Sequence, residues 1–246
     1  MKNQTTVDDV VRMAIEDLFP NHIVPDQRNH IRKGWQHKAP DHLIMDGAIA
    51  IERKSRNAVD RSQFYKKLQE IATEQGYPFW GVGKLDIKAI IRALPDPEEA
   101  NKRMADFMMN QTMKTVRSAH KKFVEYAASV PRQGQIRVLI ISDNTTIRGG
   151  TASTEYCLGR RMGALPDFDD EFPIIDSIFY IKDPRFTLDE ENSYWFKSLV
   201  RSHLEHSQSS LVINLSTALH HRVMHYGPYF DAARRFKISS LQHCLV

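Results

Sequence analysis

The sequence predicts a single α/β domain with additional, mostly helical elements. The prediction comes from amphipathic helical patterns at the start and in the middle of the chain, a compact hairpin between them, and strand-like apolar runs further on. At 246 residues, with 41% hydrophobic and 26% charged residues, the chain can bury one large core. Since no internal repeat or low-complexity linker interrupts the sequence, we expect residues 1 to 246 to form one domain.

The composition argues against several other classes of protein. No apolar run approaches the roughly 20 residues that span a bilayer, and the first residues lack the apolar stretch of a signal peptide. We therefore expect a soluble, cytoplasmic protein without a membrane partner. Two cysteines, Cys157 and Cys244, are too few and too far apart for a disulfide framework or a zinc ribbon.

The charge pattern permits binding to nucleic acid without proving it. The formal net charge is only +4, which is too mild to identify such a partner. Basic side chains nevertheless gather locally, where they could contact phosphates. These stretches cover residues 28 to 38, 53 to 67, 114 to 122 and 222 to 237.

The first predicted element is an amphipathic helix over 7 to 19, whose apolar residues recur on one helical face. Thr6 and Asp9 have the spacing of a capping box, and Pro20 ends the pattern. Residues 21 to 40 are polar and basic, with a short strand expected near 30 to 35. A hairpin over 41 to 54 follows.

Helices and strands are then expected in alternation. Gly76 ends the first of these helices, and β-branched residues favour the strands. The predicted helices cover 61 to 75, 87 to 94 and 98 to 129, and the predicted strands cover 79 to 83, 135 to 142, 174 to 181 and 211 to 215. We interpret 85 to 130 as a candidate helical insertion and 184 to 246 as additional C-terminal elements.

The hairpin is the most informative segment. Its turn dipeptide, Asp46-Gly47, favours type I′ geometry. A two-residue loop there and a four-residue loop over 45 to 48 give the same register, in which Asp41 faces Glu52. Because side chains alternate between the faces of a strand, the hairpin has two distinct faces. One carries Asp41, Leu43, Ala48, Ala50, Glu52 and Lys54, and the other carries Ile44, Ile49, Ile51 and Arg53.

Two opposed carboxylates on a hairpin lie about 5 Å apart at their Cβ atoms and destabilise the sheet unless something compensates their charge. A hard divalent cation would do so, because Mg²⁺ takes oxygen ligands and keeps waters that a phosphate oxygen can replace. Lys54 follows Glu52 on the same face and could contact a scissile phosphate or a metal-bound water. Ala48 and Ala50 are expected to leave room for a substrate on that face.

Pro40-Asp41 and Glu52-Arg53-Lys54 together resemble the motif of the PD-(D/E)xK nuclease superfamily, which includes restriction endonucleases, junction resolvases and repair exonucleases. The resemblance implies a restriction-endonuclease-like αβββαβ core with a mixed central sheet and the motif on its second and third strands. It also implies that Asp41, Glu52 and the backbone carbonyl of Arg53 bind the metal, while Lys54 positions the attacking water. An ordinary surface hairpin with solvated acids and a plain salt bridge is the alternative.

Further candidate residues flank the motif. Relatives often carry another acid on the first helix, for which Glu16 fits by position, although the helical phase favours Asp8 at the edge of the apolar stripe. Asp8 could instead interact with the helix dipole. Gln63 and Lys66, early in the following helix, could reach the substrate or be surface residues.

A histidine pattern offers a different site. His220, His221 and His225 form HHxxxH, and the last two would share one helix face, as zinc ligands can. The glutamate of a metalloprotease motif is absent, so surface histidines or histidines that contact phosphate are the preferred interpretation.

These observations predict a deoxyribonuclease that uses Mg²⁺, with Mn²⁺ expected to substitute, and that acts on DNA as a homodimer because one site cuts one strand. A type II restriction-like endonuclease in bacterial defence fits best. A Holliday-junction resolvase or DNA-repair nuclease, and a non-catalytic nucleic-acid-binding protein on the same fold, stay open as alternatives. The residues do not decide whether the substrate is DNA or RNA, or whether the enzyme is an endonuclease or an exonuclease.

Overall fold

The computed structural model describes residues 6–25, 39–56, 61–77, 87–143, 158, 171–182, 195–201 and 204–226. Within these residues, five strands form one mixed sheet in the order β1-β2-β3-β4-β5. Their bounds are His42–Ile44, Ile49–Arg56, Ile136–Asp143, Ser177–Lys182 and Trp195–Val200. The two outer pairs are antiparallel and the two inner pairs are parallel. The predicted α/β class is confirmed.

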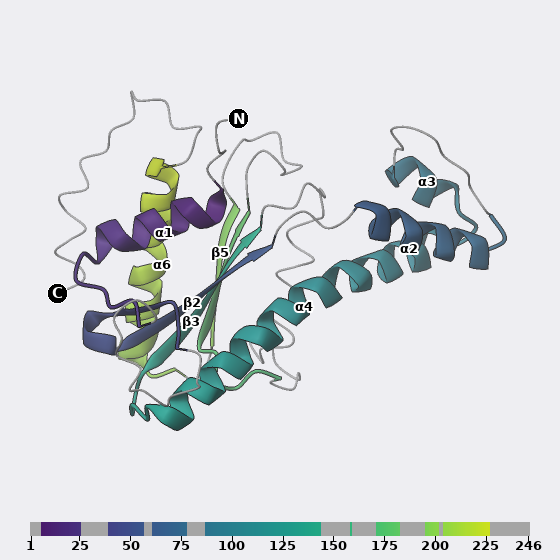
Figure 1. Ribbon diagram of the computed structural model, residues 1–246. Helices are drawn as coiled ribbons and strands as arrows, with labels where there is room; N and C mark the ends of the chain where they lie inside the picture. Colours follow the sequence, from purple (N-terminus) through teal and green to yellow (C-terminus); the bar gives the residue numbers. More distant parts are fainter. Residues whose placement is uncertain are drawn as a thin grey trace.

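Helices cover both faces of this sheet (Figure 1). Helices α1 (Val7–Leu18) and α6 (His206–Tyr226) lie on one face, and the long helix α4 (Pro97–Ser129) lies on the other. Helix α1 starts as predicted, because the Thr6 hydroxyl accepts from the Asp9 backbone and the Asp9 side chain accepts from Thr6. None of the described helices combines the length and apolar composition needed to cross a lipid bilayer.

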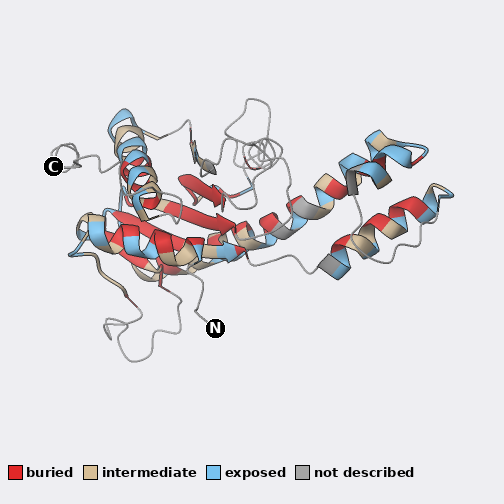
Figure 2. Cartoon of the chain, turned by 90° about the horizontal axis from the view of Figure 1, so that it is seen from above, coloured by how far each residue is buried: buried red, intermediate tan, exposed pale blue. Residues whose placement is uncertain are grey.

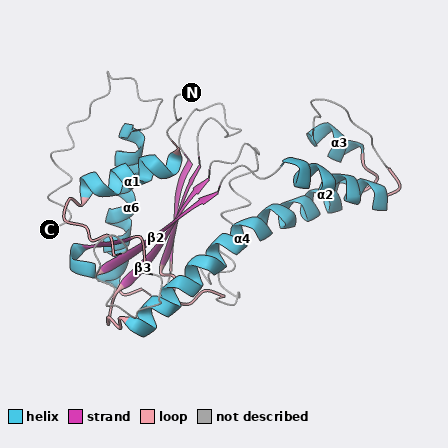
Figure 3. Ribbon diagram, in the orientation of Figure 1, coloured by secondary structure: helices cyan, strands magenta, loops and turns pink. Residues whose placement is uncertain are grey.

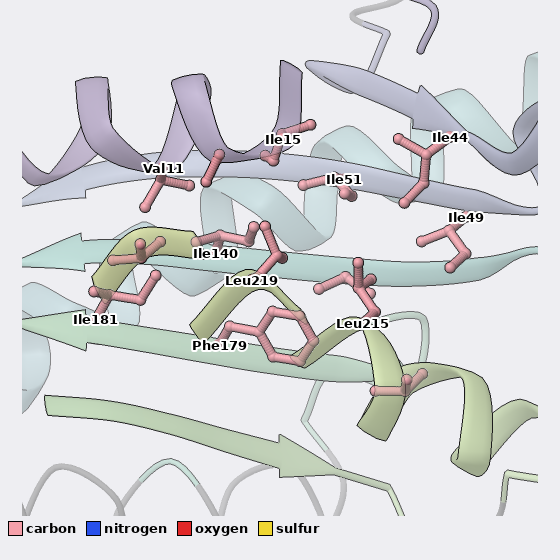
Figure 4. Close-up of a cluster of buried hydrophobic side chains, with 14 of the residues drawn as sticks. Val11, Ile15, Ile44, Ile49, Ile51, Ile140, Phe179, Ile181, Leu215 and Leu219 are labelled. Atoms are coloured by element: carbon pink, nitrogen blue, oxygen red, sulfur yellow. The ribbon is translucent and has the colours of Figure 1, made fainter. Parts of the chain in front are cut away.

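The larger core lies between the sheet and the helices α1 and α6 (Figure 4). The hairpin contributes three isoleucines, which pack with α1 and α6 residues and with inner-strand residues. Burying each such side chain contributes about 1.5–3 kcal/mol. The labelled members are Val11, Ile15, Ile44, Ile49, Ile51, Ile140, Phe179, Ile181, Leu215 and Leu219.

A second core fills the opposite face, under α4. Leu43 and Ala50 of the hairpin pack here, together with Leu139 and Ile141 of β3 and with α4 side chains such as Phe123. The two faces of the hairpin therefore alternate as the sequence predicted. The expectation that Ala50 leaves room for a substrate is wrong, because Ala50 is fully buried in this core, whereas Ala48 is exposed in the loop.

Helices α2 (Arg61–Glu74) and α3 (Ile87–Ala93) pack on the first half of α4, away from the sheet (Figures 1 and 2). They share a separate cluster of buried residues that includes Phe64, Leu68 and Met104. The second half of α4 instead covers the sheet. The helices match the predicted ranges. Helix α4 contributes both to the core beneath the sheet and to the cluster that it shares with α2 and α3.

The hairpin loop adopts the four-residue alternative. Strand β1 ends at Ile44 and β2 begins at Ile49, with the predicted pairing of Leu43 with Ala50. Met45, Asp46 and Gly47 all have positive φ, at 52°, 54° and 84°. Because only glycine adopts this region without strain, Gly47 suits the tightest position of the reversal.

Three predictions for the later elements need correction, the first of them in α6, which Figure 3 draws as a helix. Residues 211 to 215 form no strand but lie within α6, where Val212, Leu215 and Leu219 recur on one buried helical face while Ile213 is 53% exposed. Strand β5, in the predicted C-terminal region, was not expected, because its apolar residues stand in pairs on either side of Lys197 and Ser198 instead of alternating with polar ones. Strand β4 begins three residues later than predicted, because Ile175 closes a turn onto Phe172.

Several expectations concern residues outside those described. They are the strands near 30 to 35 and 79 to 83, the basic stretch 28 to 38, residues 227 to 237 of the last basic stretch, residues 227 to 246 of the C-terminal elements, and the two cysteines.

Candidate functional site

The hairpin brings Asp41 and Glu52 together at its open end. Asp41 lies one residue before β1, and its Oδ2 accepts a hydrogen bond of 2.7 Å from the backbone N–H of Arg53. Glu52 lies inside β2 on the face covered by α4. Both carboxylates contact one ammonium group, since Lys122 Nζ on α4 lies 3.2 Å from Asp41 Oδ1 and 2.7 Å from Glu52 Oε2. The two acids therefore share one side of the sheet.

Lys54 lies beside the same pair. Its Nζ is 2.8 Å from Glu52 Oε1, so the Glu52 carboxylate lies between two ammonium groups. The side chain of Glu52 is only 1% exposed, whereas those of Lys54 and Asp41 are each 28% exposed. Solvent therefore reaches the cluster at Asp41 and Lys54, whereas Glu52 is shielded from it.

The ionisation of the cluster reflects its burial. Burial raises the pKa of Glu52, the neighbouring Asp41 carboxylate adds to the rise, and Lys122 and Lys54 oppose it. Burial alone would lower the pKa of Lys122, but its contacts with Glu52 and Asp41 raise it overall. Two carboxylates and two ammonium groups thus attract one another in a partly buried site.

The oxygen donors of this cluster fit a hard divalent cation. The carboxylates of Asp41 and Glu52 are the ligand type that Mg²⁺ prefers, and Mg²⁺ commonly uses one or two protein carboxylates and several waters. On an extended strand the N–H and C=O of one residue point the same way. The Arg53 carbonyl therefore points to the same side of β2 as its N–H, which donates to Asp41. No larger group of three or more His, Cys, Asp or Glu side chains suited to a metal occurs among the described residues.

The two acids considered on α1 have different surroundings. Asp8 contacts Arg53, with Asp8 Oδ2 3.3 Å from Arg53 Nη1. Burial raises the pKa of Asp8, nearby carboxylates such as Asp41 add to the rise, and Arg53 opposes it. Glu16 pairs with Arg12 one turn earlier, and its side chain is 42% exposed. The structure thus brings Asp8, but not Glu16, close to the hairpin, on the face opposite α4.

The other sequence candidates lie apart from the acids. Gln63 and Lys66 are exposed on α2, which packs on the first half of α4, away from the sheet. Of the three histidines of the HHxxxH pattern on α6, His220 stacks on Phe196 with ring centroids 5.1 Å apart, while His221 and His225 are exposed. The surface interpretation of the HHxxxH pattern therefore fits His221 and His225 but not His220, which is half-buried against β5.

Sequence reasoning did not single out Lys122, although it lies in the basic stretch 114 to 122. A signal for it exists in the helical phase of α4. Ala119, Phe123 and Tyr126 form the buried stripe of this segment, and Lys122 falls at the edge of that stripe. The same edge argument identified Asp8, and it would have indicated a half-buried lysine facing the sheet.

A second polar cluster occupies the same face at the carboxyl ends of the parallel strands. Asp143, the last residue of β3, accepts from the Tyr180 hydroxyl, and its Oδ2 lies 3.3 Å from Arg56 Nη1. Lys182 is buried at the end of the next strand. Burial and the Asp143 charge raise the pKa of Tyr180, and burial lowers that of Lys182.

Comparisons add no relative to this description: no family model, no curated protein and no solved structure matches the chain.

Proposed function

We propose that the chain is a cytoplasmic, Mg²⁺-dependent nuclease that hydrolyses phosphodiester bonds in DNA through Asp41, Glu52 and Lys54. The observation that carries the proposal is the contact of two carboxylates, one just before β1 and one within β2, with a single cationic group. A structural ion pair needs only one acid, and placing two acids side by side costs stability unless a cation is bound between them.

The order of elements supports a restriction-endonuclease-like core. An isolated antiparallel bridge between Ile23 and Leu43 adds an extended segment outside β1. The chain therefore runs from α1 through this segment, β1 and β2 to α4 and then to β3, which is parallel to β2. This order parallels the αβββαβ core of the PD-(D/E)xK superfamily, although the first strand is reduced to a bridge and α2 and α3 are additions.

The proposed chemistry assigns one task to each group. Asp41, Glu52 and the Arg53 carbonyl hold the metal, which when bound lowers the pKa of a water and stabilises charge developing on the phosphate. Lys54 orients the attacking water and contacts the scissile phosphate. The water gives up a proton to solvent as its oxygen bonds to phosphorus, the bond from phosphorus to the leaving oxygen breaks, and the leaving oxygen takes up a proton from solvent.

The proposed substrate is DNA, cut by a homodimer in a restriction-like role. Lys114, Arg117 and Lys121 recur on one exposed face of α4, the helix that also carries Lys122 toward the acids. Such a row suits contacts to successive phosphates. Two copies of the site are needed to cut both strands of a duplex.

Incubation of supercoiled plasmid DNA with Mg²⁺ or EDTA tests the proposal. Wild-type protein should nick or linearise the plasmid only with the metal, and Mn²⁺ should replace Mg²⁺. Lys54→Ala should abolish cleavage while keeping DNA affinity, and the matched control Lys102→Ala, at a lysine side chain that is 74% exposed on α4, should cleave normally. Cleavage by Lys54→Ala at the wild-type rate would reject the assignment.

The same assay separates the alternatives. Discrete, reproducible fragments favour a restriction-like endonuclease, whereas preferential cleavage of a four-way junction favours a resolvase or repair nuclease. DNA binding without any metal-dependent cleavage would favour the non-catalytic protein on the same fold.

A further inference from the structure

Two consecutive lysines of α4 have opposite environments. The side chain of Lys121 is 80% exposed, and its Nζ lies 3.8 Å from Oε1 of Glu125, one turn further along the helix. The side chain of Lys122 is only 12% exposed and contacts both Asp41 and Glu52. Burying a lysine costs free energy through desolvation and lost rotamer freedom, so its position between the two acids needs a specific compensation.

We propose that Lys122 is a built-in counter-ion that holds the position of the divalent cation, and that metal binding must displace its ammonium group. The proposal rests on the proposed function, because it concerns the same carboxylates. It assigns to the Lys122 ammonium group, which contacts both acids, the place that the cation takes when it binds.

The displacement follows from the atoms involved. Lys122 uses Glu52 Oε2 and Asp41 Oδ1, one oxygen from each carboxylate. A Mg²⁺ ion that binds both acids would need their oxygens at about 2.0–2.1 Å. The Lys122 ammonium group has no lone pair to donate to the ion and cannot remain next to it. The ion and the Lys122 ammonium therefore compete for one place between the acids.

Charge balance leads to the same conclusion. With Lys54 and Lys122 both in contact with the acids, the four side chains carry no net charge. A divalent cation gains little from a neutral site and is repelled by both ammonium groups. Once Lys122 withdraws, the site carries one net negative charge and Lys54 keeps its contact with Glu52.

Calorimetric titration of Mn²⁺ into the protein without nucleic acid tests this proposal. Lys122→Met removes the competing charge and should bind Mn²⁺ about tenfold more tightly, a change equivalent to about 1.4 kcal/mol. Lys122→Arg keeps a positive charge and should stay close to wild-type affinity. Lys121→Met, the matched control from the same helix, should not change the affinity.

A second readout covers loss of stability in Lys122→Met, which leaves the acid pair with Lys54 alone. Added Mn²⁺ should then raise its melting temperature more than that of wild-type protein, and Lys122→Gln should behave in the same way. Equal Mn²⁺ affinity in Lys122→Met and Lys121→Met, with equal metal-induced stabilisation, would overturn the proposal.

The outcomes also distinguish this proposal from the proposed function. Tighter Mn²⁺ binding by Lys122→Met without any DNA cleavage would support the counter-ion and reject only the nuclease reaction. Cleavage by wild-type protein, with Mn²⁺ affinity unchanged in Lys122→Met, would reject only the counter-ion. A failure of every variant to bind Mn²⁺ would overturn both.

Discussion

The backbone N–H of Arg53 donates to the side chain of Asp41 across the open end of the hairpin, at 2.7 Å. The bond joins the start of β1 to the middle of β2, so the fold itself orients one oxygen of Asp41. The other oxygen faces Lys122. Asp41 thereby has both a structural and a proposed catalytic role, which different substitutions should separate.

Asp41→Ala should destabilise the protein by about 1 kcal/mol, because the Arg53 N–H loses its acceptor. Asp41→Asn keeps a carbonyl oxygen for this bond and should lose less stability, although it removes the negative charge. Urea denaturation of both variants measures the difference. Equal losses of stability would show that the hydrogen bond from Arg53 contributes nothing.

Gly47→Ala should destabilise the hairpin by about 2 kcal/mol, through strain at positive φ and loss of a neighbouring hydrogen bond. An added Cβ would meet Arg132 Nη1, which donates to the Asp46 carbonyl at 2.8 Å. Gly76→Ala is the matched control, since Gly76 also has positive φ but open space around it. Denaturant titration should show the smaller loss for Gly76→Ala, and the reverse order would contradict this explanation.

The hairpin was predictable because strong local rules govern it. The alternation of Ile49, Ala50 and Ile51 fixes which side chains enter each core, and a one-residue slip would turn every one to the wrong face. The register and the shared face of the two acids follow from the same alternation. The capping box of α1 was predictable for a similarly local reason.

The remaining errors come from tertiary contacts. An apolar run such as 211 to 215 suits a strand or a buried helix, and packing against the sheet decides for α6. Lys122 joins the acids only because α4 crosses the sheet above them, which no spacing in the sequence expresses. The same helix closes the face that was expected to admit a substrate.

Asp143→Asn should cost about 3 kcal/mol of folding free energy, because it leaves buried Arg56 without its carboxylate. Tyr180→Phe removes only the hydroxyl that donates to Asp143 and should cost about 1 kcal/mol. Urea denaturation compares the two variants. A larger loss for Tyr180→Phe would show that the charge pair is not the main contribution.

The protein should lose stability in mild acid through His42. Burial lowers the pKa of His42 from 6.5 to about 4, so the folded protein keeps this ring neutral while the unfolded chain takes up a proton below pH 6.5. Stability should therefore fall as the pH decreases from 6.5 toward 4. The expected contribution is about 2 kcal/mol between pH 7 and 5.

His42→Phe removes this group at similar volume. As the pH falls from 7 to 5, the free energy of unfolding of His42→Phe should rise by about 2 kcal/mol relative to that of wild-type protein, as measured by denaturant titration at each pH. A constant difference between the two proteins would contradict the neutral, buried ring.

The central claim is that Asp41 and Glu52 act as one unit in hydrolysis. The most direct measurement is the Mg²⁺-dependent cleavage rate of DNA by Asp41→Asn, Glu52→Gln and the double variant. Each single substitution should reduce the rate by at least about 10²-fold, and the double variant should be little worse than either, because groups that act together are non-additive. Wild-type rates in the single variants, or fully multiplicative losses in the double variant, would contradict the account.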